Sequence, residues 1–521
     1  MKRFLCFPVL LLLASSVISP LQGQDKTRLI ICADMGNEPD EMQQMAHMLA
    51  CCNEFDLEGL IAVTGKFLRP NHHRGEYKSK VHPELFHELI DAYEKVLPNL
   101  KKHADGWPAP DYLRGIVKSG QPGYGIRDVG KGTTSEGAQL IIDALDKEDP
   151  RPIWVVVNAG SNTLAQALYV IKTTRSASEL REAVAKLRIY ENGSQDNAGA
   201  WIASEFPEIH WIRSNYQTYA YGGPGGKSGG VNENLGPHQW KPFDYTSKGQ
   251  AEWTWEHIQK NHGALGEAYP DRSFRPGHYA FMEGGGTIPW MGLVNKGLFD
   301  IDQPSWGGWS GRFTDKKVAC FWSRHGDIRP DEELMAPFYV YREASDYWID
   351  PQDGQAYEGD YVPIWRFRPA MYADFAARMD WCVRSYEDAN HHPVAAVDGD
   401  ISDSIIRLRA TPGESLSFDA SASSDPDGDA LEYYWWIYEE AGTYSGNIAV
   451  SGADSAQASL TIPTGARNEQ IHLVLELRDK NPEVALTDYR RIVIDVSDFE
   501  PWSDSPQNLK KERFDLMPIP R

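Results

Sequence analysis

Short runs of apolar residues alternate with amphipathic helical patterns over roughly the first two hundred positions. The segments RLIICADM, LEGLIAVTG, PIWVVVNAG and KLRIYEN are each predicted to form a strand. Between them, residues 83–96 place apolar side chains on one face of a helix. Strands that are apolar along their length and separated by helices are typical of a parallel sheet covered on both faces. The pattern therefore predicts a mostly parallel α/β domain.

Polar residues follow three of these predicted strands directly. Asp34 comes after the first, residues 158–162 after the third, and residues 191–196 after the fourth. Parallel α/β sheets bind their ligands at the carboxyl ends of the strands. We therefore expect a binding or catalytic site where these polar residues meet.

Helical periodicity ends after NHHPVAAVDGD, residues 390–400. The following hundred residues form short segments of alternating polarity, separated by Gly, Pro and Asp. This pattern predicts an all-β sandwich of immunoglobulin size, an Ig-like domain. We place the α/β domain at 24–392, the sandwich at 393–497 and a tail at 498–521.

The N-terminus has the pattern of a secretory signal peptide. Lys2 and Arg3 precede an apolar run over residues 4–13, and small or polar residues continue to Gly23. This run is too short to anchor the chain in a membrane, and no later run is longer. We predict a signal peptide over residues 1–23 and a secreted or periplasmic protein.

The net charge of the chain is −22. Nucleic acids and anionic membranes are polyanions that bind basic surfaces, so this charge argues against both as partners. It suits neutral or cationic ligands.

Five cysteines follow the predicted signal peptide: Cys32, Cys51, Cys52, Cys320 and Cys382. Their spacing matches neither a zinc site nor a dense disulfide framework. One disulfide is possible, and we favour buried free thiols.

The segment after the first strand, called here the acidic loop (residues 34–41), carries Asp34, Glu38, Asp40 and Glu41. Crowded carboxylates repel one another unless a cation or hydrogen bonds compensate them. Ca²⁺ or Mg²⁺ is the simplest compensator, and a metal-bound water beside a carboxylate base can hydrolyse a substrate. The alternative is that Glu38 and Glu41 stabilise the N-terminus of the next helix. This alternative accounts for Glu41 but poorly for Asp34, which precedes the helix.

Further candidates lie later in the chain. Gln195, Asp196 and Asn197 could hold sugar hydroxyls, or could cap the helix that begins at Ala198. Asp425, Asp427 and Asp429 form either a Ca²⁺ loop or an Asx turn, and we favour the turn. The Gly-rich residues 222–236 form either a linker or a loop over a site.

The segment PSWGGWSGR offers Trp306, Trp309 and Arg312 to a sugar ring. Tryptophan is more often a core residue, but two tryptophans in a Gly-rich loop are hard to bury fully, so both interpretations stay open. Arg366 and Arg368 are expected to pair with carboxylates beneath the domain junction.

The segment LIICADMGNEPDE resembles the nucleoside hydrolase motif, in which a strand precedes D-x-D-P-G-x-D-D. Here Cys32 replaces the first Asp, and two residues are inserted between Asp34 and Asp40. The segment TSEGAQLIIDALDKEDPRPIWVVVNAGSNTLAQAL is similar to the helix, strand and GPLTNLALAL segment of that fold.

The whole chain resembles secreted bacterial proteins described as cellulose-binding, which join a nucleoside hydrolase-like domain to an Ig-like domain. The segments that carry this resemblance are ADMGNEPDE, NAGSNTLAQAL, SQDNAGAWI, PSWGGWSGRF, DFAARMDWCV, NHHPV, SSDPDGDALEYYWWIYEEAGTY and IHLVLELRD.

The resemblance implies roles for individual residues. Asp34 matches the general base that also bridges to the metal, and Asp40 matches the carboxylate that holds a sugar hydroxyl. Glu41 matches the second metal carboxylate, although Asp is usual there. Asn162 falls where the backbone carbonyl binds Ca²⁺.

Nucleoside hydrolases supply one more Asp late in the domain. The matching region here is FMEGGGTIPW, where Gly285 or Gly286 stands in place of that Asp. Glu283 could substitute for it as a metal ligand from a shifted position.

We expect hydrolysis of an N- or O-glycosidic bond in a carbohydrate or nucleoside-like substrate, with Ca²⁺ as cofactor. The alternative is a non-catalytic protein that binds a cellulose-like polysaccharide through a degenerate hydrolase site. A purely structural role at the cell surface is a third possibility.

Overall fold

The structure is a computed structural model that describes residues 26–130, 132, 134–221, 253–271, 285–294, 297–320, 325–351 and 354–497. The predicted signal peptide, residues 222–236, Glu283 and the tail from residue 498 lie outside the described residues.

The first domain is built on an eight-stranded sheet in the order β3-β2-β1-β4-β5-β6-β8-β7. All neighbouring strands are parallel except β7, which runs antiparallel to β8. The strands are β1 Arg28–Ala33, β2 Asp56–Ala62, β3 Val117–Ser119, β4 Ile153–Val157, β5 Leu187–Asn192, β6 His210–Ser214, β7 Val318–Cys320 and β8 Phe338–Arg342. The predicted, mostly parallel α/β domain is confirmed.

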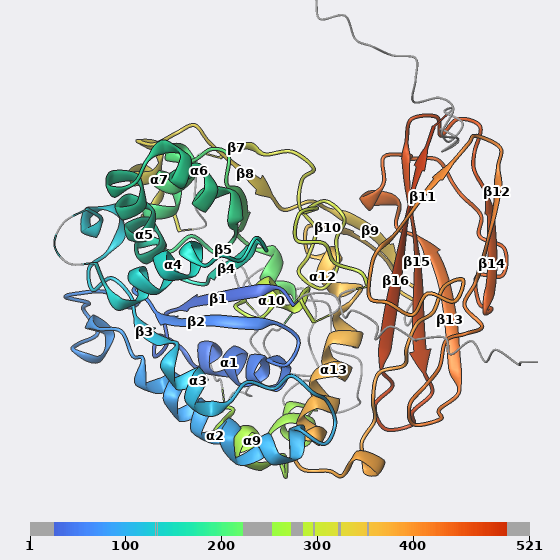
Figure 1. The fold of residues 1–521 in the computed structure, drawn as a ribbon, viewed down its shortest axis with the longest axis horizontal. Coiled ribbons are helices and arrows are strands. Elements are labelled where there is room, and N and C mark those ends of the chain that lie inside the picture. The colour runs from blue at the N-terminus through green and yellow to red at the C-terminus, as the bar shows by residue number, and fades with distance from the viewer. Residues whose placement is uncertain are drawn as a thin grey trace, which may run out of the picture.

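Helices cover both faces of this sheet (Figure 1). On one face lie α1 Pro39–Cys51, α2 Glu84–Leu100 and α13 Arg368–Trp381, and on the other lie α4 Glu136–Asp146, α5 Asn162–Thr174, α6 Ala177–Lys186 and α7 Ala198–Glu205. Strand β1 shows why its sequence is apolar throughout. Leu29 and Ile31 pack into the core on the α1 side, and Ile30 and Cys32 into the core on the α5 side.

The direction in which the chain fills the sheet reverses between β1 and β4. Strands β2 and β3 lie on one side of β1, and β4, β5 and β6 continue on the other. In open α/β sheets, the carboxyl ends of the strands at such a reversal form the ligand crevice. Asp34 follows β1 and Asn158 follows β4, so the fold places both residues at this point.

Shorter elements complete the first domain. The helices are α3 Pro110–Gly115, α9 Gly263–Ala268, α10 Ile288–Met291, α11 Arg329–Glu333 and α12 Val362–Trp365, with single turns η1 Tyr77–Ser79, η2 Gly125–Asp128, η3 Gln217–Ala220, η5 Trp255–Gln259 and η6 Tyr386–Asp388. The hairpin of β9 Asp346–Ile349 and β10 Ala356–Gly359 lies beside the second domain (Figure 1).

The second domain is the predicted β-sandwich. One sheet has the order β11-β16-β15-β13 and the other pairs β12 with β14. The strands are β11 Ile406–Ala410, β12 Ser415–Asp419, β13 Leu431–Ile437, β14 Gln457–Thr461, β15 Gln470–Asp479 and β16 Thr487–Val496, and the turn η7 covers Glu439–Ala441. Phe418, Trp435 and Leu460 lie in its core.

Buried polar contacts join the two domains. The Arg491 side chain donates through Nε to the carbonyl of Leu298 at 2.9 Å and through Nη2 to that of Gly307 at 3.0 Å. Asp346 accepts hydrogen bonds from Arg312 Nε at 2.6 Å and from the Tyr438 hydroxyl at 2.7 Å. Because these groups are buried, the contacts hold the domains in one arrangement.

Two smaller expectations are settled by the structure. All five cysteines are free and buried, as we favoured. Arg366 lies 3.4 Å from Asp346 and 3.9 Å from Glu440, which confirms its place at the domain junction, whereas Arg368 donates to the carbonyl of Ala220 at 3.2 Å within the first domain. Within the described ranges, no helix is long and apolar enough to cross a membrane.

The acidic turn of the sandwich has the geometry of an Asx turn. Asp425 Oδ1 accepts from the backbone N–H groups of Asp427 at 2.9 Å and Asp429 at 3.0 Å. The Asp427 carboxylate accepts from the backbone N–H of His391 at 2.7 Å. These contacts support the turn, which we favoured over a Ca²⁺ loop.

Candidate functional site

Asp34 follows β1 at the reversal of the strand order, as a buried carboxyl group with 1% of its surface exposed. Neither of its oxygens accepts a hydrogen bond from any donor in the described part of the chain. Glu41 can hydrogen-bond to it only by carrying a proton itself. Burial raises the pKa of Asp34 well above its usual value, and the charges of Asp40 and Glu38 raise it further.

Local structure explains how Asp34 reaches this position. The carbonyl of Ala33 accepts from Val63 N at 2.9 Å, and that of Cys32 accepts from Asn158 N at 2.9 Å, so Asp34 emerges between β2 and β4. The loop then turns at Gly36, whose φ is +87°. A Cβ atom at Gly36 would lie 2.7 Å from the His82 ring, so a larger residue would not fit this turn.

The rest of the acidic loop opens helix α1. Asp40 and Glu41 lie in its first turn, where carboxylates are stabilised by the helix dipole. Glu41 is buried and accepts from Gln44 Nε2, whereas Asp40 is partly exposed. Asp34 and Glu41 therefore form the inner part of the site, and Asp40 lies toward solvent.

Other oxygen atoms at the same edge also have no hydrogen-bond partner within the described chain. They are Asn158 Oδ1 after β4, Asn162 Oδ1 at the start of α5, and Gln195 Oε1 after β5. Buried acceptors are normally satisfied, so several unsatisfied acceptors at one edge indicate a place for a ligand rich in donors or for a cation. The predicted role of the Asn162 carbonyl as a metal ligand stays a prediction.

The segment expected to carry the third carboxylate does reach this site. The carbonyl of Gly285 accepts from Asn192 Nδ2 at 2.7 Å, and that of Gly286 accepts from Asn158 Nδ2 at 3.3 Å. A Cβ atom at Gly286 would lie 2.7 Å from Asn158 Nδ2 and 2.9 Å from Gln44 Nε2. Glycine thus stands where a carboxylate would face the Asn158 and Gln44 amides.

Lys78 also belongs to the site, although no sequence motif marked it. Its ammonium group donates to the carbonyls of Gly36, at 2.9 Å, and Asn37. Burial lowers the pKa of Lys78, while the charges of Asp34 and Glu38 oppose this shift. Lys78 therefore supplies positive charge beside the acidic loop.

The structure corrects the predicted sugar contacts of Asp196 and limits those of Asn197. Asp196 is fully buried and accepts from Asn162 N at 3.2 Å and Ala198 N at 2.9 Å. Asn197 is partly exposed, but its Oδ1 accepts from Ile126 N at 2.9 Å. Asp196 therefore caps α7 and ties it to α5, as the alternative interpretation has it. Gln195 keeps an unpaired oxygen and remains a candidate.

The predicted contact of Trp306, Trp309 and Arg312 with a sugar is wrong, because all three side chains are buried. Trp306 is buried beneath Arg407, whose guanidinium lies 4.7 Å from the ring centroid. Trp309 is 1% exposed and packs edge-to-face on Tyr489. Arg312 is held by Asp346, as described above. The sandwich covers this loop, so its aromatic faces are not free for a sugar.

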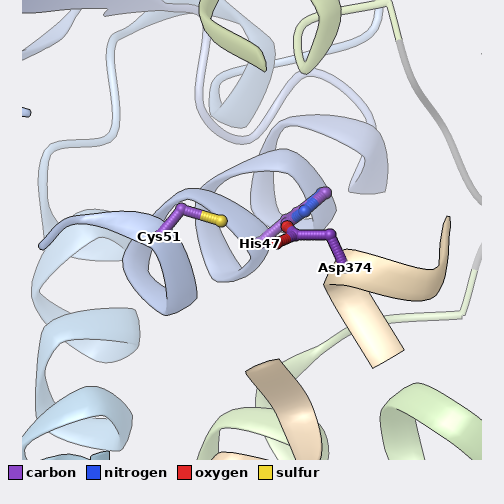
Figure 2. A group of neighbouring side chains, drawn as sticks. All are labelled: His47, Cys51 and Asp374. Carbon is purple, nitrogen blue, oxygen red and sulfur yellow. The ribbon is translucent and has the colours of Figure 1, made fainter. Parts of the chain in front are cut away.

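The carboxylates of the acidic loop do not come together as one group of metal ligands. Among the described residues, one group brings three ligand-type side chains within 4.8 Å of one another, namely His47, Cys51 and Asp374. Figure 2 shows His47 and Cys51 on α1 facing Asp374 on α13. Asp34, Asp40 and Glu41 do not form such a group.

The His47 cluster is explained by packing between helices. Asp374 accepts from Arg378 Nε at 2.8 Å and from His392 Nε2 at 2.8 Å, which hold its pKa below the usual value although burial acts to raise it. His47 stacks on Phe375 at 3.7 Å, and burial lowers its pKa to about 3. Burial raises the pKa of Cys51, and a metal here would meet the Arg378 guanidinium.

Two family models match this chain. Residues 28–313 match the nucleoside hydrolase-like domain of the cellulose-binding Sde182 family. Residues 415–496 match the C-terminal domain of the cellulose-binding protein Sde0182. No curated protein matches the chain.

Solved structures are also similar to this chain. A nucleoside hydrolase-related hypothetical protein from Saccharophagus degradans, described as associated with carbohydrate metabolism, is 38% identical, with a TM-score of 0.75 over 91% of this chain and all of that chain. An endo-fucoidan hydrolase of glycoside hydrolase family 107 (TM-score 0.17, 9% identity, 92% of this chain and 69% of that one) carries no argument about fold. An endo-β-1,4-mannanase from Thermotoga petrophila also carries no argument about fold (TM-score 0.16, 9% identity, 91% of this chain and 98% of that one).

We predict that Trp309→Ala destabilises the protein by about 3–5 kcal/mol, because a large buried aromatic side chain leaves a cavity. Urea denaturation followed by circular dichroism measures the change. Trp255→Ala is the matched control, because Trp255 is 53% exposed. A Trp309→Ala variant as stable as the control would show that the loop is not held by the sandwich.

We predict that Asp196 makes the stability of the protein depend on pH. Burial raises its pKa from 3.8 to about 7, so the folded state keeps a proton that the unfolded state has lost. Stability from this group is full below the unfolded pKa and is lost as the pH rises through about 7. Melting temperatures between about pH 5 and pH 9 should fall less steeply in Asp196→Asn than in the parent.

Asp111→Asn serves as the control for this measurement, because the Asp111 side chain is 97% exposed. It should follow the parent. Equal slopes for the parent and Asp196→Asn would contradict the prediction.

Proposed function

Because the chain belongs to the cellulose-binding family that carries a nucleoside hydrolase-like domain, we propose that it hydrolyses a glycosidic bond at the acidic loop. One observation carries the proposal: Asp34 is buried at the reversal point of the sheet with both carboxylate oxygens unpaired within the described chain. A structural carboxylate would be satisfied by donors, as Asp374 and Asp196 are.

The buried oxygen atoms fit a hard cation in their chemistry. Asp34 and Glu41 would hold Ca²⁺, with Asn158 Oδ1 as a further oxygen donor from β4. A bound Ca²⁺ would supply the positive charge that keeps Asp34 ionised at neutral pH and lowers the pKa of a nearby water.

Asp34 acts as the general base in this proposal. Its carboxylate takes one proton from a water molecule, and the resulting hydroxide attacks the anomeric carbon as the glycosidic bond breaks. The bonding electrons leave with the aglycone or the second sugar, which takes up a proton from solvent. Burial disfavours the charge of Asp34, so the proposed base would need the bound cation to stay ionised; once ionised, it would act on the water molecule in a site of low dielectric constant.

The remaining residues bind and orient the sugar. Asp40 is partly exposed beside Asp34 and would accept hydrogen bonds from sugar hydroxyls. Asn158 Oδ1 and Gln195 Oε1 offer two more acceptors at the same edge. Lys78 would limit the negative charge of the loop while the sugar enters.

A second candidate function is favoured by Gly286. Glycine at a position that faces the Asn158 and Gln44 amides leaves the site without the third carboxylate that the resemblance implies. A site of this composition would bind a glycan and leave its bonds intact. The N-terminal segment and the family's association with cellulose support action outside the cytoplasm in either case.

We predict that Asp34→Asn lowers turnover by about 10²–10⁴-fold, because the amide cannot take a proton from water. The assay measures release of reducing sugar, base or phenol from cellulose, nucleosides and aryl glycosides at about 1 mM Ca²⁺. Removal of Ca²⁺ with a chelator should lower turnover in the parent. Asp111→Asn, at an exposed carboxylate, is the matched control.

Full turnover by a folded Asp34→Asn variant would exclude Asp34 as the base. If the parent is inactive on every substrate, Gly286→Asp separates the two candidate functions. Activity gained by this variant identifies a hydrolase scaffold that has become a binding protein. Continued inactivity contradicts the proposed hydrolysis.

A further inference from the structure

A groove of about 1150 Å³, which the sequence did not predict, runs between the two domains. One wall is strand β9 of the first domain together with Arg366, and the floor is the outer face of β13 and β15 in the sandwich. Pockets for drug-sized ligands measure about 300–1,000 Å³, so the groove has room for several sugar units. None of its lining residues belongs to the acidic loop.

The floor carries aromatic faces because of the alternation along β13. Trp435 points into the sandwich core, so Tyr434 and Trp436 point the other way, toward the first domain. Tyr434 is 54% exposed. Its neighbour across the strand pair is Glu476, which forms an ion pair of 2.9 Å with Arg478. An exposed aromatic ring thus lies next to a hydrogen-bond acceptor and a donor.

The facing wall is also aromatic and exposed. Tyr347 and Ile349 of β9 are 53% and 58% exposed, and Trp348 between them is partly exposed. All three line the groove. Exposed large apolar side chains contribute little to the fold, and their gathering on two facing surfaces indicates a binding site.

The groove is held rigid by the domain junction. Tyr438 of the sandwich donates to Asp346, the first residue of β9, at 2.7 Å. The backbone N–H of Tyr347 donates to Glu440 Oε1 at 2.7 Å. Arg366 lies over the Trp436 ring and donates to the carbonyl of Tyr347 at 3.0 Å. Both walls are therefore positioned before a ligand arrives, which lowers the entropy cost of binding.

The charges of the lining select among glycans. The groove contains six carboxylic side chains and three basic ones. The excess of carboxylic side chains would repel an anionic polysaccharide. A neutral polysaccharide offers hydroxyl groups that can hydrogen-bond to both the carboxylic and the basic side chains. Flat aromatic rings suit the C–H faces of pyranose units in which the hydroxyls are equatorial.

We propose that this interdomain groove binds a chain of neutral, β-linked glucan such as cellulose. The site is separate from the acidic loop and does not require that loop to be catalytic. It places the glycan-binding surface on the junction of the two domains, so neither domain alone holds the complete site.

The test is depletion of the protein from solution by microcrystalline cellulose, with cellohexaose as a soluble competitor. Tyr434→Ala and Tyr347→Ala should each weaken binding by roughly threefold to tenfold, as loss of one aromatic contact implies. The double variant should lose most of the retention. Both side chains are half exposed, so the variants keep the fold, which melting temperatures check.

Tyr339→Ala is the matched control, because Tyr339 is 46% exposed on β8 and does not line the groove. It should bind like the parent. Each groove variant is also made in the Asp34→Asn background, so that loss of binding and loss of hydrolysis are separate readouts. Retention equal to the parent in the double variant would overturn the proposal. So would retention that is lost only through Asp34→Asn, or tighter binding to an anionic polysaccharide such as alginate.

Discussion

Burial without hydrogen-bond donors disfavours the ionised form of a carboxyl group. Asp34 is such a group, and it follows β1 in the centre of the sheet. The strand order reverses between β1 and β4, and the carboxyl ends of these strands meet beside Asp34. Neither oxygen of this group has a donor among the described residues unless Glu41 carries a proton, so the described chain does little to stabilise its charge. Asn158 Oδ1 and Gln195 Oε1, after β4 and β5, are also buried without a hydrogen-bond partner among the described residues. The site is thus arranged for a cation or a polyhydroxylated ligand.

Buried hydrogen bonds join the two domains. Arg491 reaches from the sandwich to the carbonyls of Leu298 and Gly307, and Tyr438 reaches to Asp346. The same contacts bury Trp306 and Trp309 and align the walls of the groove. A junction of this kind would let a polymer be held at one place and processed at another.

Local patterns were sufficient to predict strands β1, β2, β4 and β5, the sandwich and the acidic loop. Strand β1 is apolar on both faces because helices cover both, and such a run is visible in the sequence itself. Asp34 could be identified because it directly follows that run.

Contacts between distant segments could not be predicted in this way. The Trp306–Trp309 loop seemed too rich in glycine to be buried, but His472 and Tyr489 of the sandwich close over it. Asp196 was predicted to bind a sugar, but its carboxylate accepts a hydrogen bond from the backbone N–H of Asn162 in α5. The contact of Lys78 with the acidic loop could not be predicted, because Lys78 and Gly36 are far apart in the chain. The groove could not be predicted for the same reason, since both domains line it.

Calcium titration by isothermal calorimetry measures whether a cation binds at the unpaired Asp34 carboxylate. Our expectation is a binding heat in the parent that disappears in Asp34→Asn and persists in Asp427→Asn. A heat that is unchanged in Asp34→Asn would contradict it, as would a heat lost only in Asp427→Asn, which would place the ion at the turn of the sandwich.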